Sequence, residues 1–313
     1  MKTAAVLITV LAASFMAAQE QSSASAPASP GAPQAGTPNA GRPPVKTKTR
    51  EEYKAYQTAV ANAQNPDAME KAADDFAARF PASDVRVLLY RAAMSGYQNV
   101  GNPQKMMDMG LKVLAINKDD PEALIDIAEI LEERTGPTDL DRQQRSEQVI
   151  EYATHALKTL DTDLVIPAGT SSDRVDAFKK YLRSTALAII GTIYYKQEHY
   201  PEAEAKLRDA LDADAADPDP VVVLRLALAL HQQKKYADAL EQANRAIELT
   251  QESTDLGQTA RNERDRLLEQ SGGSVSRATT PPAVAPETPN QVAPQTVPPS
   301  NQGTPGQASS PSH

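Results

Sequence analysis

The chain contains no cysteine and no tryptophan, and only 4% of its 313 residues are aromatic. The missing cysteine excludes a disulfide framework, a cysteine nucleophile and the acylated cysteine of a lipoprotein. Basic residues are also in the minority, with 32 Lys and Arg against 41 Asp and Glu. The resulting net charge of -9 argues against nucleic acid as a partner, because nucleic-acid binding requires basic patches.

A long hydrophobic run is missing as well. The apolar run Ala4–Ala13 follows Lys2 and falls well short of the roughly 20 residues that a membrane span needs. Together with the small residues that follow it, this run is typical of a secretory signal peptide over residues 1–18, with cleavage between Ala18 and Ala24. We therefore expect an exported protein, periplasmic in a bacterium with two membranes, without a transmembrane anchor after cleavage. A retained signal anchor is the alternative.

Catalytic and metal-binding motifs are absent from the sequence. The four histidines, His155, His199, His231 and His313, lie far apart, and none has a partner at metal-ligand spacing. There is no HExxH, no GxSxG and no glycine-rich phosphate loop. We therefore predict no catalytic residue, no cofactor and no metal site, and we expect a protein that is not an enzyme. An enzyme or carrier whose site has no recognisable motif remains the alternative.

Two segments are rich in Pro, Ala, Ser, Gly and Gln and poor in large apolar residues: 19–49 and 271–313. Such segments cannot bury enough surface to offset the entropy lost on ordering, so we expect both to be disordered. This leaves residues 50–270 as the folded domain. The basic end of the first segment, around Lys46 and Lys48, is interpreted as a solvated linker end or as a contact with an anionic surface.

The folded domain contains one pattern of large and small residues twice, within residues 185–251. The first copy has Leu187, Ile190, Gly191, Tyr194, Tyr200, Ala203, Leu207, Ala210 and Leu211, and the second has Val223, Leu226, Ala227, Leu230, Tyr236, Ala239, Ala243, Ala246 and Ile247. The spacings of three and four predict two amphipathic helices per copy. The copies are offset by 36 residues.

This pattern resembles two tetratricopeptide repeats (TPRs), whose period is 34 residues. The resemblance implies an all-α, right-handed solenoid in which each helix pair stacks on its neighbours. Less regular units at 51–80, 84–120 and 121–160 bring the total to about five TPR-like helix pairs. A polar helix over 254–269 would cap the C-terminal end.

Two insertions interrupt the repeat spacing, at 135–148 and 161–183. We expect an exposed loop at Val165–Thr170 in the second insertion. Ser172 would then begin an unusually long helix that continues into the first regular repeat. The methionines of the unit 84–120 are expected to fill the core rather than to form an adaptable binding surface.

Four acidic residues at steps of four, three and four share one face of the helix that begins at Pro121: Glu122, Asp126, Glu129 and Glu133. The TPR resemblance implies that they line the groove of the solenoid. The corresponding positions elsewhere are Arg86, Tyr90, Ala93 and Tyr97, then Thr185, Ile189, Thr192 and Lys196, then Val221, Arg225, Leu228 and Gln232. The predicted partner-binding groove comprises Glu122, Asp126, Glu129, Glu133, Thr192, Lys196, Arg225 and Leu228.

Two interpretations of the acidic face stay open. It is a solvated helix face of an acidic protein, or it steers and holds a basic or extended segment of a protein partner. TPR proteins that clamp a C-terminal carboxylate use Lys, Arg and Asn at such positions, so the acids here disfavour an acidic tail as the partner. The predicted function is an exported, non-enzymatic TPR scaffold for protein–protein interaction in the cell envelope. An accessory factor for outer-membrane or division machinery is one alternative.

Overall fold

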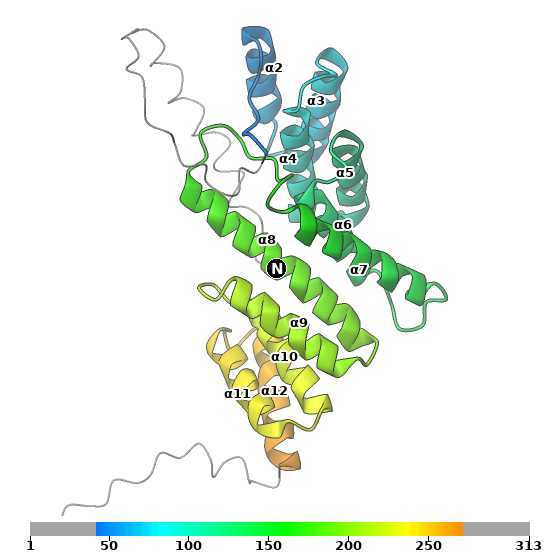
Figure 1. Cartoon of the computed structure of the whole chain (residues 1–313), viewed down its shortest axis with the longest axis vertical. Coiled ribbons are helices and arrows are strands. Elements are labelled where there is room, and N and C mark those ends of the chain that lie inside the picture. The colour runs from blue at the N-terminus through cyan, green and yellow to red at the C-terminus, as the bar shows by residue number, and fades with distance from the viewer. Residues whose placement is uncertain (1–41, 272–313) are drawn as a thin grey trace, which may run out of the picture.

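The computed structural model of the protein describes residues 42–271, and this part of the chain folds into eleven α-helices with no regular strand (Figure 1). The helices are α2 (Arg50–Val60), α3 (Pro66–Arg79), α4 (Arg86–Asn99), α5 (Pro103–Ile116), α6 (Pro121–Glu133), α7 (Arg142–Thr159), α8 (Ser172–Lys196), α9 (Tyr200–Ala213), α10 (Pro220–Gln232), α11 (Tyr236–Glu248) and α12 (Asp255–Gln270). No described helix is long and apolar enough to cross a membrane.

The helices pack in chain order, each against the helix before and the helix after it. First helices of neighbouring pairs also touch, as α6 touches α8 and α8 touches α10. This arrangement is the predicted helical solenoid of five pairs, α2–α3 to α10–α11, with α12 covering the last pair. Figure 1 shows α8 running between the N-terminal helices and the C-terminal ones, and its 25 residues confirm the predicted long helix.

The helix starts follow local sequence signals. Asn65, Asn102 and Asp120 each accept a hydrogen bond from the backbone N–H three residues later, and each is followed by proline in the first helical turn. Such a cap satisfies a backbone donor that the helix itself cannot pair. The turns of the two regular repeats are alike as well, since Glu198 and Lys234 both have φ near +60°, at 65° and 62°.

Close helix contacts fix the register of the repeats. A β-carbon on Gly191 would lie 2.8 Å from Cγ of Leu207, the residue 16 positions later. A β-carbon on Gly110 would lie 3.6 Å from Sδ of Met94, also 16 positions away. Met94 therefore stands where Gly191 stands, 34 residues before Ala128. The groove positions predicted on α4 assumed a register two residues out of step with this contact, so the prediction was wrong for that helix.

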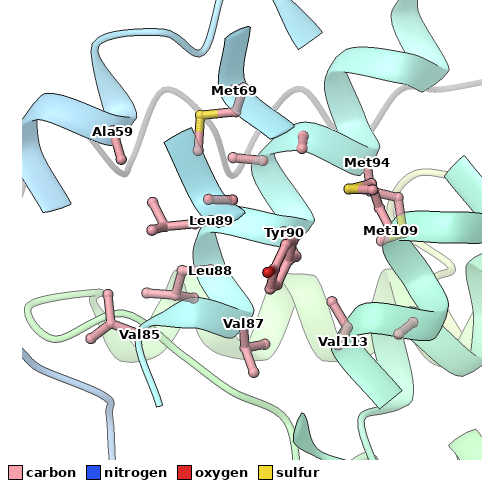
Figure 2. Close-up of a cluster of buried hydrophobic side chains, with 14 of the residues drawn as sticks. Ala59, Met69, Val85, Val87, Leu88, Leu89, Tyr90, Met94, Met109 and Val113 are labelled. Atoms are coloured by element: carbon pink, nitrogen blue, oxygen red, sulfur yellow. The ribbon is translucent and has the colours of Figure 1, made fainter. Parts of the chain in front are cut away.

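Met94, Met106 and Met109 of the unit 84–120 are buried in the core, as predicted, and Met107 is partly buried against it. Figure 2 shows Met69, Met94 and Met109 among the valines and leucines of the N-terminal cluster. Met69 and Met109 are completely buried. Unbranched side chains of this kind fill irregular gaps between helices, which suits units whose spacing departs from the regular repeat.

The second insertion packs against the segment that precedes α2. Val45 forms a single parallel bridge with Pro167, donating to the carbonyl of Ile166 and accepting from the N–H of Ala168. Val165, Ile166 and Pro167 are buried, so the first half of the loop expected to be exposed is covered, while Gly169 is exposed. The expected disordered linker likewise differs from the structure over residues 42–49, where Val45 is 7% exposed. The signal peptide, the rest of that linker and residues 272–313 of the tail lie outside the described residues.

Candidate functional site

The acidic residues predicted on one face of α6 do lie along that helix between its buried positions. Glu122, Asp126 and Glu129 are half-buried, and Glu133 is exposed. The face that carries these four side chains is called the α6 acidic face below. Because α6 packs on α7 and on α8, its carboxylates are partly enclosed rather than standing free in solvent.

Arg91 of α4 neutralises the N-terminal end of the α6 acidic face. Its guanidinium donates two hydrogen bonds of 2.7 Å to the carboxylate of Asp120 and lies 2.7 Å from Oε2 of Glu122. It also donates to the carbonyl of Val165 at 2.8 Å, so it ties the second insertion to α6. Arg91 is 5% exposed and Asp120 is fully buried. Glu122 is thus a partner in an internal ion pair and differs from the free groove residue that was expected.

Asp126 and Glu129 have no such partner, since neither forms a hydrogen bond or ion pair with any residue between 42 and 271. Burial raises the pKa of Asp126 well above its usual range, and the charges of Glu122 and Glu129 raise it further. Burial and the nearby Glu133 and Glu132 raise the pKa of Glu129 to about 7. Both shifts mean that these groups favour the protonated, neutral form unless a cation approaches, because nearby cations do not fully compensate the carboxylate charge.

Residues of α8 and α10 face the same two carboxylates. Burial, together with the charges of Glu129 and Asp126, raises the pKa of the Tyr181 phenol to about 12. Arg225 of α10 acts on Glu129 in the opposite sense and lowers its pKa, without outweighing the burial. The site therefore brings together α6, α8 and α10. Tyr181 was missing from the predicted groove, although it lies four residues before Thr185 on the same side of α8.

The other predicted groove residues have different surroundings. Lys196 extends from α8 to Glu132, with Nζ 2.6 Å from Oε1 and 2.9 Å from the backbone carbonyl. Thr192 is 2% exposed, and its hydroxyl donates to the carbonyl of Ala188 in its own helix, so its place in the groove was wrongly predicted. Leu228 is half-buried and packs against the C-terminal core.

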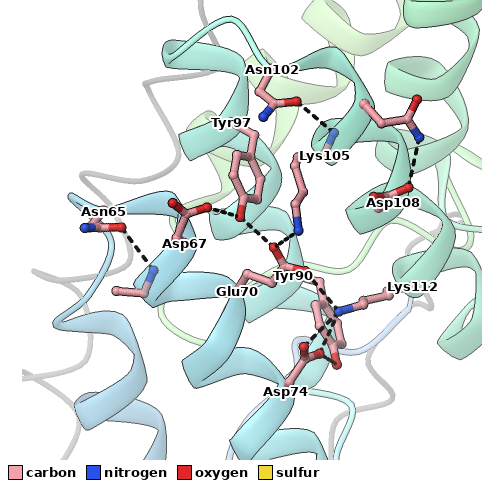
Figure 3. A network of polar contacts seen from close by, with 12 residues as sticks. Asn65, Asp67, Glu70, Asp74, Tyr90, Tyr97, Asn102, Lys105, Asp108 and Lys112 are labelled. Carbon is pink, nitrogen blue, oxygen red and sulfur yellow. Dashed lines mark hydrogen bonds and ion pairs between the residues drawn. The ribbon is translucent and has the colours of Figure 1, made fainter.

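On α4, Tyr90 and Tyr97, two of the residues assigned to the groove, point toward α3 and α5 (Figure 3). The Tyr90 hydroxyl donates to Asp74 at 2.9 Å, and the Tyr97 hydroxyl lies 2.6 Å from Glu70 Oε2. Ala93 is completely buried. The two-residue difference in register explains this error, because it turns Tyr90 and Tyr97 from the groove to the helix interface.

Two lysines of α5 complete this cluster, called the α3–α5 network below. Nζ of Lys105 lies 2.9 Å from Glu70 and Nζ of Lys112 lies 2.8 Å from Asp74. Burial alone would raise the pKa of Glu70, but the hydrogen bonds from Tyr97 and Lys105 outweigh it and lower the pKa. Each carboxylate of the network is thus matched by a hydroxyl and an ammonium group.

The sequence matches no family model and no curated protein. Among solved structures, a thermophilic TPR protein of Thermus thermophilus is 16% identical over 68% of this chain and 98% of its own, with a TM-score of 0.43. PilW, a type IV pilus biogenesis factor, is 16% identical over 74% and 100%, with a TM-score of 0.44. BtubC of P. vanneervenii is 15% identical over 80% and 100%, with a TM-score of 0.45.

Sequence identities and TM-scores this low carry no function from those proteins to this chain. The assignment of the fold rests on helix pairing and register. The fold is a TPR-like helical solenoid. Within the described part of this solenoid, no three His, Asp or Glu side chains converge as metal ligands would. The chemistry that the α6 acidic face offers is the electrostatic attraction of a cation to enclosed carboxylates.

Proposed function

We propose that this TPR-like protein is a scaffold that binds an extended, basic segment of a protein partner along the α6 acidic face. The observation that carries the proposal is the pair Asp126 and Glu129, whose carboxylates are enclosed and lack a cationic partner among the described residues. Enclosing such charges costs free energy unless an opposite charge compensates them. A lysine or arginine of a partner would supply that charge.

The internal ion pairs of α6 favour this location. Arg91 compensates Glu122 at the N-terminal end of the face, whereas Lys196 pairs with Glu132, which lies off the face and next to Glu133 in the chain. Between them, Asp126 and Glu129 form the uncompensated stretch. Tyr181 lies beside it and offers an aromatic ring, which adds to the attraction for a cationic side chain.

We also infer that the protein acts outside the cytoplasm, in the cell envelope. Lys2, the short apolar run and the small residues after it support export by a signal peptide. The mass of the intact protein from its native host tests this inference. Loss of roughly 18 to 24 residues is expected, and a full-length protein in the membrane fraction would contradict it.

Two other functions compete with a general scaffold. An accessory factor for outer-membrane or division machinery would be a special case of the scaffold, with a partner from that machinery. An enzyme or carrier with a motif-less site is a different class, and steady turnover or stoichiometric binding of a small molecule by the purified protein would favour it.

The decisive experiment compares two double variants with the same change of charge. Asp126→Asn with Glu129→Gln neutralises the uncompensated stretch, whereas Glu147→Gln with Glu151→Gln neutralises two exposed residues of α7. Both are tagged and used to isolate partners from the native envelope fraction. We expect the parent and the α7 variant to retain the same stoichiometric partner and the α6 variant to lose it.

The salt dependence of association sharpens this test. With the isolated partner, the parent should associate faster at low ionic strength than at high ionic strength, because screening weakens electrostatic steering. The α6 variant should lose most of that dependence. If both double variants bind as fast as the parent at every ionic strength, the α6 acidic face is a solvated surface and the proposed site is wrong.

A further inference from the structure

The segment that precedes α2 is held on the second insertion in the way that an extended peptide is held by a protein. In this segment, residues 42–47, called the strap below, Val45 is the one buried side chain. The N–H of Val45 donates to the carbonyl of Ile166 at 3.0 Å, and its carbonyl accepts from the N–H of Ala168 at 3.2 Å. These bonds, on either side of Pro167, are those of a parallel strand pair. The strap is therefore bound through its backbone and one aliphatic side chain.

The surface that receives the strap is anchored independently of it. In residues 164–168, called the docking segment below, Leu164 and Ile166 pack into the core cluster formed by α6, α7 and α8. The carbonyl of Val165 accepts a 2.8 Å hydrogen bond from Arg91 of α4. Because these contacts come from four helices, the docking segment stays in place when the strap leaves it.

The strap is the weaker side of this contact. Pro43, Pro44 and Lys46 are exposed, and proline has no N–H with which to extend the pairing. Beyond Val45, Arg42 adds one backbone hydrogen bond, to the carbonyl of Thr162 at 2.9 Å. A segment with so few buried contacts opens locally far more often than the whole domain unfolds.

The docking segment lies on the groove side of α4. In the corrected register of that helix, Leu88 and Ala92 occupy the positions that Glu122 and Asp126 occupy on α6, 34 residues later. Leu88 is 2% exposed and Ala92 is 5% exposed, and Leu88 shares a core cluster with Val165 and with the strap. The groove is thus filled over α4 by the chain's own extended segments, at a place where a solenoid of this kind can receive a partner.

We propose that the docking segment is a second binding site, which takes an extended segment of a partner protein in place of the strap. The partner segment that fits carries a β-branched aliphatic residue after residues that need no backbone donor, as Val45 follows Pro43 and Pro44. Main-chain hydrogen bonds to Ile166 and Ala168 supply affinity, and the socket of Val45 supplies specificity. The strap is then an internal competitor that closes the site until such a segment displaces it.

Hydrogen exchange on the full chain tests whether the strap can be exchanged. The amides of Val45 and Ala168, corrected for intrinsic exchange, should be roughly a hundredfold or more less protected than the most protected amides of α4. Protection equal to that of α4 would make the strap part of the cooperative core and would overturn the proposal.

A peptide of residues 42–49 with blocked ends tests the site in trans. Val45→Asp in the full chain should release the strap, because a buried carboxylate without a partner is costly. In NMR titrations this variant should bind the peptide at least about tenfold more tightly than the parent, whose tethered strap competes. The amide signal of Ala168 should return toward its position in the parent. The same peptide with Val45→Asp is the control and should not bind.

Two results of the titration contradict the proposal. Binding to neither protein would mean that the strap is a fixed part of the fold, and equal binding to both would place the peptide at another site. The exchange rates of the α4 amides report whether Val45→Asp keeps the fold. If they rise, the milder Val45→Ser takes its place, and the exchange comparison within the parent decides independently.

Discussion

The α3–α5 network and the α6 acidic face are built from the same kinds of side chain but differ in charge balance. In the network, Glu70 and Asp74 meet two lysines and two tyrosine hydroxyls (Figure 3). On the α6 acidic face, Asp126 and Glu129 lie near other carboxylates and a phenol, and the charges of Arg91 and Arg225 do not outweigh their burial. The pKa of Glu70 is lowered and that of Glu129 is raised, although each glutamate belongs to a helix that packs between two other helices.

The difference separates a structural use of charge from a functional one. Paired carboxylates join three helices and stabilise the fold through charge-assisted hydrogen bonds. Enclosed carboxylates without a cation oppose folding, by their own desolvation and by mutual repulsion along the helix. Arg91 and Arg225 lower the pKa values of Asp126 and Glu129 without outweighing burial, so these two carboxylates are the ones that the proposed function assigns to a partner.

Arg91 offers the strongest way to break this comparison, because its removal turns compensated acids into uncompensated ones. Arg91→Met leaves the buried Asp120 and the adjacent Glu122 without their cation. Breaking a buried ion pair on one side costs about 3 to 5 kcal/mol, and urea denaturation measures this loss. Lys118→Met removes an exposed lysine paired with Asp119 and should leave the unfolding free energy almost unchanged, because solvent screens exposed ion pairs. Equal costs for the two variants would show that Arg91 has no special role.

Within the α3–α5 network, removal of a single hydrogen-bonding group should also lower the unfolding free energy, but by less than Arg91→Met does. Tyr97→Phe deletes the hydroxyl that contacts Asp67 and Glu70, while the ring stays in the core. A loss of about 1.5 to 3 kcal/mol is expected, the usual range for a hydrogen bond to a charged group. Tyr53→Phe is the control, because it removes a hydroxyl that accepts a hydrogen bond from the exposed side chain of Gln57, a neutral group; its cost should be smaller than that of Tyr97→Phe. If Tyr97→Phe leaves the unfolding free energy unchanged, the network contributes no stability.

The helices were predictable from the sequence because their signals are local. Asn65, Asn102 and Asp120 before prolines mark helix starts, and the spacing of apolar residues marks the buried faces. The register of the regular repeats followed from Gly191 and Ala227. On α4 the large Met94 takes the position of a small residue, and only the contact with Gly110 reveals it.

The pairing of the acids could not be predicted from the sequence. Glu122 and Asp126 are similar residues four positions apart on the same helix face, yet only Glu122 forms an ion pair with Arg91, which acts on Asp126 without direct contact. That difference depends on where α4 lies relative to α6, which no local pattern encodes. The burial of Val165 was missed for the same reason, because its partners Val45 and Arg91 are distant in sequence.

Neutralising a carboxylate of the α6 acidic face should change the unfolding free energy in the opposite direction from neutralising a carboxylate of the α3–α5 network. Asp126→Asn removes an enclosed, uncompensated charge, so the unfolding free energy should stay constant or rise by up to about 1 kcal/mol. Asp74→Asn weakens the contacts with Tyr90 and Lys112 and should lower it by about 1 kcal/mol. Thermal and urea unfolding of the two variants give the comparison. Destabilisation by Asp126→Asn would reveal a structural role for this carboxylate.

The smallest expected effect is a difference in pH dependence between Glu129→Gln and Glu70→Gln. The pKa of Glu129 is raised to about 7 in the folded protein, above an unfolded value of about 4.3. The folded state therefore binds its proton more tightly, and stability falls as the pH rises through this window. The lowered pKa of Glu70 acts in the opposite sense, and its stabilisation is lost as the pH falls through the folded value.

Each substitution should remove one of these two slopes from the stability–pH curve. Glu129→Gln should flatten the fall between about pH 4.5 and about pH 7, by about 1 kcal/mol or less because water still reaches this carboxylate. Glu70→Gln should leave that window unchanged and reduce the loss of stability in acid. Urea denaturation at closely spaced pH values resolves the two effects. If Glu129→Gln has the same curve as the parent, the carboxylate is already solvated, and the contrast between the two regions does not extend to this residue.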